Sequence, residues 1–331
     1  RKMNQTKKGT ILTLVAGFSW GISGISGQYL MANGVHVNLL TSLRLLIAGL
    51  FLTVLAYFQD KKTLKILLTS KKNLLGIVFF ALFGLVLNQY AYLSAIRYTN
   101  AGTATVLQYA TPVLVLIYAC LRSRVLPSWT EVVAIVLAIG GVFMMATHGN
   151  LSELAITPAG LFWGILSAFT YAAYLLLPAQ LIRTYGSLPV ISLSMLLGGL
   201  LFPLFSQAWN YSFDMTGTNL LALFGIVGIG TIFAYTVFLH GVSIVGAVKG
   251  SLLASVEPVA SVLLTVLVMG TQFYLTDFIG MVLIIIIRQI DLSVGSMLGV
   301  TAMIIGVIQT FWLPNILGAG HPLIWIIAAL A

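Results

Sequence analysis

Apolar residues in this chain occur in long continuous runs that are separated by short polar or Gly/Pro-containing segments. The runs cover about 9–30, 36–58, 73–96, 103–121, 129–147, 157–180, 188–206, 218–241, 246–269 and 274–288. A helix needs about 20 apolar residues to cross the hydrocarbon core of a bilayer, and most of these runs reach or approach that length. Because the runs are continuous rather than alternating, they disfavour a β-barrel. The pattern predicts an all-α membrane protein with ten transmembrane helices.

Composition supports this class and excludes two others. Of the 331 residues, 60% are apolar and 7% are charged, and the mean hydropathy is +1.06. Soluble domains carry about 25% charged residues, and disordered chains have low hydrophobicity. The sequence contains no phosphate-binding loop, zinc spacing or His-Glu-x-x-His motif. We therefore expect neither an enzyme nor a bound cofactor, and the single cysteine, Cys120, cannot form a disulfide within the chain.

The positive charges are distributed unevenly between alternate loops. One set of loops carries Arg1, Lys2, Lys7, Lys8, Lys61, Lys62, Lys65, Lys71, Lys72, Arg122, Arg124, Arg183, Lys249 and Arg288. The other set carries Arg97, and Arg44 falls inside the second apolar run. Because Lys and Arg accumulate in cytoplasmic loops, the distribution predicts a multi-pass plasma-membrane protein with a cytoplasmic N-terminus. The net charge of +9 is thus a topology signal, and nucleic acid is excluded as a partner.

The two halves of the chain resemble each other. A shift of 146 residues superimposes identical residues, namely Asn73 on Asn219, Gly84 on Gly230 and Pro112 on Pro258. This predicts one five-helix repeat in residues 1–150 and a second in residues 151–288. Because five is odd, the second repeat enters the membrane from the opposite side, which is the inverted arrangement of many secondary transporters.

Several local motifs strengthen the transport interpretation. They are Ser19-Trp20-Gly21 in the first helix, Arg44 in the second, Ala101-Gly102-Thr103-Ala104 at the start of the fourth, and Ser255-Val256-Glu257-Pro258-Val259 in the ninth. With these motifs the chain resembles the drug/metabolite transporter superfamily, and its EamA-type ten-helix branch in particular, over about residues 9–288. The resemblance implies a transporter of small metabolites with a central cavity lined by helices 1, 3, 4, 6, 8 and 9.

The C-terminal part does not fit this pattern. Residues 289–331 follow the complete repeat, with one full-length apolar run at about 294–313 and one from about 322 that is too short to cross. The stretch Gln289–Ser296 resembles a segment of the sugar and autoinducer ABC permeases. We expect a gene fusion or chimera here, and a natural accessory helix is the alternative.

Glu257 is the acidic residue that the pattern places deepest in an apolar run. A carboxylate there is costly and normally marks a functional site. We expect it to bind a cation or to couple transport to protons, and the following Pro258 leaves a backbone carbonyl without its helical partner. The alternatives are a helix cap or an ion pair with Lys249 or Arg44. For Arg44 and Lys249 themselves, we expect packing, ion-pair or interfacial roles, with contact to an anionic substrate group left open; for His240 we expect an interfacial role.

Aromatic and amide side chains are the other substrate-binding candidates, because metabolite pockets combine apolar walls with a few convergent polar groups. Together with Glu257 the candidates are Trp20, Asn88, Gln89, Tyr92, Gln108, Tyr109, Tyr171 and Tyr235. The alternative is that they form interhelical hydrogen bonds and packing contacts.

The sequence therefore predicts a secondary transporter of small organic metabolites such as amino acids or amines, working by alternating access as a monomer or homodimer in the lipid bilayer. The family resemblance favours export. An importer or facilitative exchanger is the alternative within transport. A non-transporting membrane scaffold is the alternative outside it, and would bury the same polar side chains between packed helices without a cavity.

Overall fold

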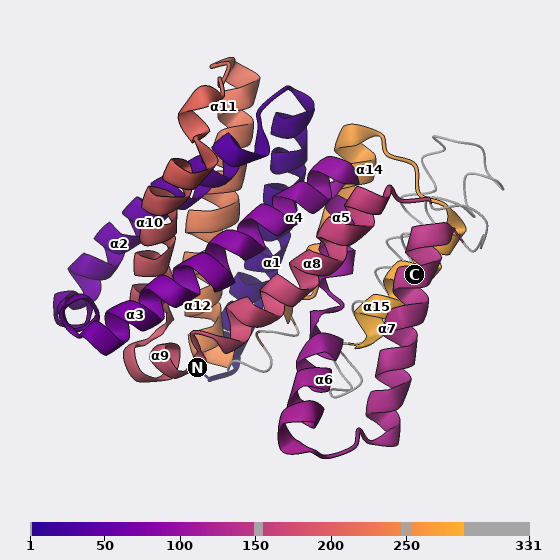
Figure 1. The fold of residues 1–331 in the computed structure, drawn as a ribbon, viewed down its shortest axis with the longest axis horizontal. Helices are drawn as coiled ribbons and strands as arrows, with labels where there is room; N and C mark the ends of the chain where they lie inside the picture. Colours follow the sequence, from indigo (N-terminus) through magenta and orange to yellow (C-terminus); the bar gives the residue numbers. More distant parts are fainter. Residues whose placement is uncertain (1, 149–154, 246–249, 251–252, 288–331) are drawn as a thin grey trace.

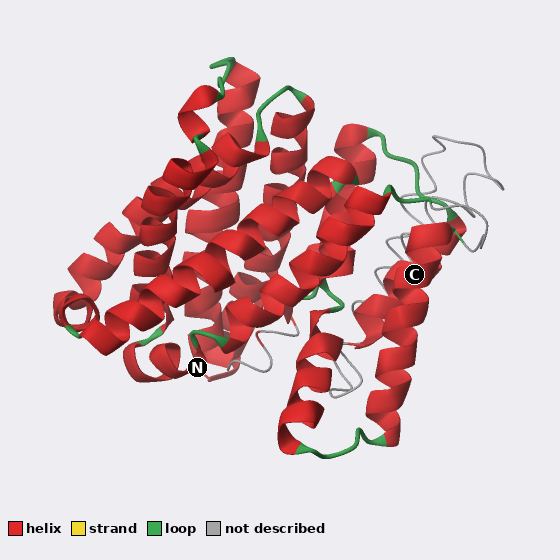
Figure 2. Cartoon of the chain, in the orientation of Figure 1, coloured by secondary structure: helices red, strands yellow, loops and turns green. Residues whose placement is uncertain are grey.

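The computed structural model describes residues 2–148, 155–245, 250 and 253–287. These residues form helices and connecting loops without any β-strand (Figure 2). Seven of their helices are long and apolar enough to cross a membrane, and three further apolar helices are shorter. The predicted all-α membrane class is confirmed over this part of the chain, whereas the predictions for residues 289–331 lie outside the described residues.

The helices follow one another with short connections (Figure 1). In the first half they are α1 (Lys2–Ala32), α2 (Val37–Thr69), α3 (Lys71–Phe79), the π-helix η1 (Phe80–Val86), α4 (Leu87–Tyr98), α5 (Ala101–Gln108), α6 (Thr111–Ser123) and α7 (Trp129–Thr147). In the second half they are α8 (Pro158–Leu176), α9 (Ala179–Tyr185), α10 (Ser187–Ser206), the 3-10 turn η2 (Ala208–Asn210), α11 (Gly217–Leu223), the π-helix η3 (Phe224–Phe233), α12 (Ala234–Val245), α14 (Val256–Met269) and α15 (Leu275–Ile287).

The second helix is longer than the sequence pattern predicts. It continues past the expected end near residue 58 to Thr69, but Asp60 interrupts it with non-helical backbone angles (φ −152°, ψ 76°). The Asp60 carboxylate accepts a hydrogen bond from the Thr63 backbone N–H at 3.1 Å, which is how a side chain caps a new helix. The capped segment turns away from the axis of α2 and is drawn nearly end-on between α2 and α3 in Figure 1.

α2 and α10 pack closely enough for their backbones to touch. A Cβ atom added to Gly49 would lie 2.5 Å from the backbone nitrogen of Leu196, and one added to Gly199 would lie 2.5 Å from that of Leu46. Small residues allow this close approach. The van der Waals packing that results stabilises helix pairs in lipid, where the hydrophobic effect does not drive them together. The pair forms one side of the bundle, and α6, α7 and α15 lie on the opposite side (Figure 1).

A methyl group at this contact tests its importance. We expect Gly49→Ala to destabilise the protein by about 1–3 kcal/mol, because the clash is with backbone that cannot move aside without separating the helices. Gly217→Ala is the matched control, since nothing lies within 4 Å of its added Cβ. Thermal unfolding of the purified variants in detergent should give a lower midpoint for Gly49→Ala alone, and equal midpoints would contradict the close-contact argument.

Candidate functional site

A cavity of about 440 Å³ lies within the bundle. It is lined by Trp20, Arg44, Asn88, Gln89, Tyr92, Gln108, Tyr109, Tyr171, Tyr174, Leu175, Ile182, Ser187, Ile191, Tyr235, Phe238, Leu239, Ala254 and Glu257. The structure thus brings all nine candidate substrate-binding residues together around one space. Their role in binding substrate stays a prediction. The family resemblance implied a lining from helices 1, 3, 4, 6, 8 and 9. The second and seventh predicted helices also contribute, through Arg44 of α2 and Ile191 of α10.

Two of the predicted helices are broken beside this cavity. The expected continuous helix 103–121 ends as α5 at Gln108 and restarts as α6 at Thr111, so that Pro112 falls in a first turn. The expected helix 246–269 is interrupted at Ala254, and α14 starts at Val256 just before Pro258. Proline has no N–H to donate, and the first turn is where a helix does not need one. The prediction of continuous helices was therefore wrong at both prolines.

The sequence pattern placed Glu257 deep inside a helix. In the structure it lies in the first turn of α14 instead. Negative charge is favourable at this position, because the unpaired N–H groups and the helix dipole point toward it. Its Oε2 atom also accepts a hydrogen bond from the Tyr109 hydroxyl at 2.8 Å. The suggested ion pair with Arg44 does not occur among the described residues, and Lys249, the other suggested partner, lies outside them.

Arg44 is buried on α2, with 5% of its surface exposed, and it lines the cavity. Its Nε–H donates to the Thr231 hydroxyl at 3.0 Å. The Thr231 hydroxyl in turn donates to the Ile226 carbonyl at 2.8 Å within the π-helix η3. Arg44 therefore packs inside the bundle, as expected, and also lines the space where a ligand would lie.

Aromatic rings form one wall of the cavity. Trp20 contacts the ring of Tyr235 at 5.7 Å and that of Phe238 at 5.0 Å, measured between ring centroids. Tyr171 stacks on Tyr174 at 5.7 Å, and the Tyr174 and Tyr235 hydroxyls are 3.0 Å apart. Sequence analysis missed Tyr174 as a candidate. Its spacing of three residues from Tyr171 places both on one helix face and was a usable signal.

Amide and hydroxyl groups link the helices around the cavity. Gln108 Nε2 donates to Asn88 Oδ1 at 3.1 Å, and the Thr170 hydroxyl, which is shared with the Ser167 carbonyl at 3.0 Å, lies 3.3 Å from the same oxygen. These bonds join α4, α5 and α8. The Tyr92 hydroxyl bonds to that of Thr105 at 2.7 Å. Asn88, Tyr92 and Gln108 therefore form interhelical hydrogen bonds, which was the alternative role, and also line the cavity.

The two ends of the bundle differ in how they enclose the cavity. At the lower end of Figure 1, near α9 and the N-terminus, Ser187 and Leu239 line both the cavity and a neighbouring pocket of about 450 Å³. Gln59 and His240 line that second pocket, which adjoins the central cavity on the side of the lower end. His240 thus lies toward the end of the bundle where an interfacial role is expected.

Toward the upper end, where α11 lies in Figure 1, α5 makes polar contacts with two other helices. The first two backbone N–H groups of α5 donate to side chains of other helices, Ala101 to Gln28 Oε1 at 2.8 Å and Gly102 to Thr265 Oγ1 at 3.1 Å. Deeper in, the Thr105 and Ser261 hydroxyls are 3.1 Å apart. These bonds hold α1, α5 and α14 together above the cavity.

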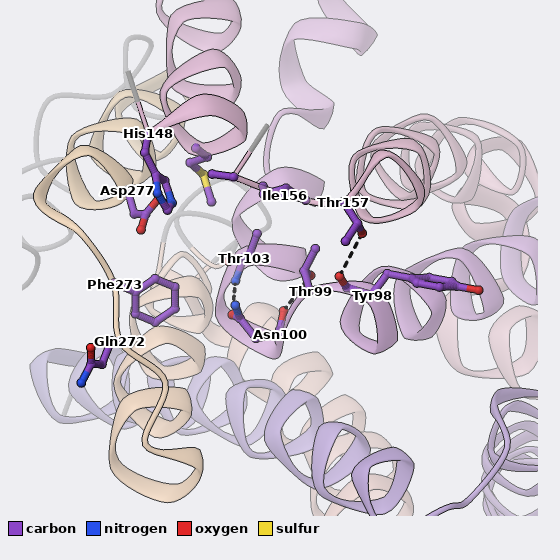
Figure 3. Close-up of a pocket in the computed structure, with 12 residues that line it drawn as sticks. Tyr98, Thr99, Asn100, Thr103, His148, Ile156, Thr157, Gln272, Phe273 and Asp277 are labelled. Carbon is purple, nitrogen blue, oxygen red and sulfur yellow. Dashed lines mark hydrogen bonds and ion pairs between the residues drawn. The ribbon is translucent and has the colours of Figure 1, made fainter. Parts of the chain in front are cut away.

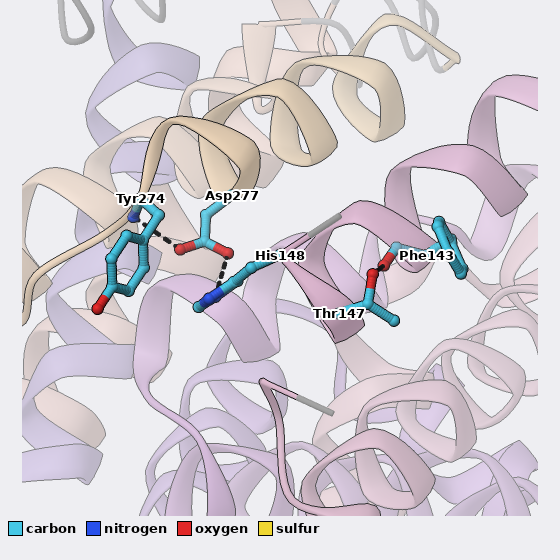
Figure 4. A network of polar contacts seen from close by, with 5 residues as sticks. All are labelled: Phe143, Thr147, His148, Tyr274 and Asp277. Carbon is cyan, nitrogen blue, oxygen red and sulfur yellow. Dashed lines mark hydrogen bonds and ion pairs between the residues drawn. The ribbon is translucent and has the colours of Figure 1, made fainter. Parts of the chain in front are cut away.

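A separate pocket of about 260 Å³ lies at the upper end (Figure 3). Its residues come from the ends of α4, α7 and α14 and the starts of α5, α8 and α15, and none of them lines the central cavity. His148 Nε2 and Asp277 Oδ1 form an ion pair at 2.8 Å here, and Asp277 Oδ2 accepts from the Tyr274 N–H at 2.8 Å (Figure 4). No sequence pattern predicts this pair, because it joins segments far apart in the chain.

The described residues that line these three pockets form no recognisable metal site. Within the part of the chain that the structure describes, no group of three His, Cys, Asp or Glu side chains is placed to hold a metal ion. What the central cavity offers is a set of hydrogen-bond donors and acceptors, aromatic surfaces, one guanidinium and one carboxylate. Such a lining suits reversible binding of a small organic molecule.

Comparison with known proteins identifies the family. The model of the EamA-like transporter family matches residues 7–147 and 158–290. The inner membrane transporter YicL of Salmonella typhimurium, itself uncharacterized, is 38% identical over 284 residues, which cover 86% of this chain and 94% of that protein. The uncharacterized transporter YetK of Bacillus subtilis is 27% identical over 284 residues, 84% of each chain.

A solved structure described only as a protein crystal structure has the same fold, with a TM-score of 0.57, 18% sequence identity, and coverage of 88% of this chain and 99% of that one. These comparisons lend no support to the resemblance of residues 289–331 to an ABC permease. They agree with the motifs and the helical architecture on the rest of the chain. This multi-pass membrane protein is a transporter and not an enzyme, and it belongs to the EamA-like transporter family.

Proposed function

We propose that this protein is a secondary transporter of small organic metabolites, such as amino acids, amines or related compounds, which binds its substrate in the central cavity and exports it by alternating access. The observation that carries the proposal is the cavity itself, of about 440 Å³, in which all nine candidate residues meet. A scaffold protein would pack these polar side chains against one another, and sites for small molecules typically measure about 300–1,000 Å³.

The halves of the structure support the inverted-repeat part of the proposal. Both π-helices, η1 and η3, lie at positions that the shift of 146 residues superimposes, and each half has a helix that restarts just before the matching proline, Pro112 or Pro258. The α2–α10 contact is also reciprocal, since Gly49 abuts the Leu196 backbone and Gly199 abuts the Leu46 backbone. Such pairs of broken helices surround the substrate sites of inverted-repeat transporters. We therefore propose residues 1–150 and 151–288 as the two rocking halves.

The direction in which the cavity opens follows from the charge distribution. The loops rich in Lys and Arg share the lower end of the bundle with the N-terminus, and this end is predicted to be cytoplasmic. The pocket that adjoins the cavity at Ser187 and Leu239 lies toward that end. We infer that this is the inward-facing state, which loads substrate from the cytoplasm as an exporter must.

Flux through purified protein tests the proposal. We expect saturable exchange of at least one member of a panel of labelled amino acids and amines in proteoliposomes. Asn88→Ala should lower this flux by about tenfold, because it removes the acceptor that joins Gln108 to Thr170. Gln272→Ala, in the upper pocket, is the control and should keep the wild-type rate. Absence of flux from folded wild-type protein would contradict transport of these compounds.

Cysteine labelling tests the inward-facing orientation. In a Cys120→Ser background, Ser187→Cys should react with a membrane-impermeant maleimide in inside-out vesicles and stay unlabelled in intact cells, since Ser187 lines the pocket toward the lower end. Thr265→Cys, whose position is buried toward the upper end, is the comparison and should be protected on both sides. Labelling of Ser187→Cys from outside the cell alone would reverse the orientation.

Substitution of Glu257 tests proton coupling. We expect wild-type flux to respond to a pH gradient and Glu257→Gln to lose this response, because glutamine keeps the Tyr109 hydrogen bond but cannot exchange a proton. Asp214→Asn removes one exposed carboxylate outside the cavity and serves as the control. If Glu257→Gln transports at the wild-type rate with unchanged pH dependence, the carboxylate does not couple transport to protons.

A further inference from the structure

We propose that Arg44 is the subsite for a carboxylate of the transported molecule, so that the central cavity selects small organic acids, including amino acids through their carboxylate. The inference rests on the proposed function, because it assigns a ligand group to the same cavity. It goes beyond that proposal in naming the chemical group that the ligand must carry.

The guanidinium of Arg44 has unused hydrogen-bonding capacity. Arginine has five N–H donors in a rigid planar fork. Over the described residues, Arg44 makes one hydrogen bond, from Nε to the Thr231 hydroxyl at 3.0 Å, and no ion pair. The two terminal amino groups, Nη1 and Nη2, therefore remain available to the cavity that this residue lines. They can donate in parallel to the two oxygens of a carboxylate.

The position of Arg44 is built into the fold and is not that of a loose surface charge. The side chain is 5% exposed, and Thr231, which holds its Nε, is itself fully buried and anchored to the Ile226 carbonyl. Burying a cation within a membrane bundle is costly unless an anion or polar groups compensate for it. The protein compensates in part, because Thr231 accepts from Nε and Glu257 lies within electrostatic range of the guanidinium, but neither makes an ion pair with it among the described residues. A ligand carboxylate would add the direct anionic partner that is missing.

The charges around the cavity would orient such a ligand. Glu257, whose carboxylate accepts from Tyr109, repels anions and makes the Arg44 end of the cavity the favourable place for them. Tyr235 and Tyr174 lie within electrostatic range of Arg44, as does Glu257 itself. Their hydroxyls bond to each other at 3.0 Å, which uses one of the two O–H donors and leaves the other for a ligand oxygen.

The number of cations favours a carboxylate over a phosphate. Arg44 is the one Lys or Arg among the described residues that line the cavity. A phosphate monoester carries a charge of about −1.5 to −2 at neutral pH, which a single guanidinium would leave partly uncompensated beside Glu257. A carboxylate carries a single negative charge and fits the planar fork. The apolar part of the molecule would pack on Trp20 and Phe238, which line the same space.

Ligand-induced stabilisation of the purified full chain tests the proposal. Wild-type protein in detergent is heated with L-leucine, with isovalerate, with the carboxamide of each, and with glycerol phosphate as the phosphate monoester. We expect the two acids to raise the unfolding midpoint and to bind at least tenfold more tightly than their carboxamides. The carboxamides keep the shape of the acids but lose the negative charge of the carboxylate. Equal effects of acids and carboxamides, or a larger effect of the phosphate monoester, would overturn the assignment.

Variants then assign the effect to Arg44. Arg44→Gln should abolish the preference for acids, and Arg44→Lys should retain part of it through charge alone. Arg97→Gln removes one exposed cation that does not line the cavity and should behave as wild type. If Arg44→Gln does not fold, the wild-type comparison of acids with carboxamides still decides. Flux without acid preference would contradict this inference alone, whereas acid-selective binding without flux would contradict the proposed transport alone.

Discussion

The absence of water in the bilayer core is the constraint on which the rest of this structure depends. Every backbone N–H and carbonyl must find a partner inside the protein, so irregular backbone is tolerated only where other protein groups or a polar cavity receive it. The chain departs from regular helix at Tyr109–Ala110 and at Ala254–Ser255, both beside the cavity. The carbonyls that the two prolines leave without their usual helical partner are satisfied locally: the Gln108 carbonyl accepts from the Thr111 hydroxyl at 2.6 Å, and the Ala254 carbonyl accepts from the Glu257 backbone N–H at 3.0 Å.

These two breaks also explain why the cavity has its particular chemistry. Each break ends one helix segment and starts another within the bundle, which brings Gln108 and Tyr109 of one half close to Glu257 of the other. The prolines that cause the breaks lie in the first turns of α6 and α14, where they cost no hydrogen bond. The side chains next to the breaks, Gln108, Tyr109 and Glu257, thereby line a common space. That space, rather than any single residue, is what a transporter needs.

Much of this arrangement could be predicted from the sequence, because hydrophobic runs report directly on segments that face lipid. The helix at 129–147 has the predicted bounds, and the nine candidate side chains gather because polar groups in lipid turn inward. The breaks were missed because a continuous apolar run does not show where a helix restarts. The continuation of α2 past Asp60 was missed for a different reason: the polar segment from Gln59 to Lys62 was interpreted as the end of the helix, whereas Asp60 caps a further helical segment there. The Arg44–Thr231 hydrogen bond and the His148–Asp277 pair depend on tertiary contacts between distant segments, which no local pattern contains.

The central claim is that substrate binds between the Arg44 and Glu257 walls of one cavity. A cryo-EM map of the full chain in a lipid nanodisc, recorded with and without saturating transported compound, tests it most directly. The account predicts additional density in the central cavity, in contact with Arg44 and beside Trp20. Ligand density in the upper pocket near His148, or an unchanged central cavity at saturation, would contradict it.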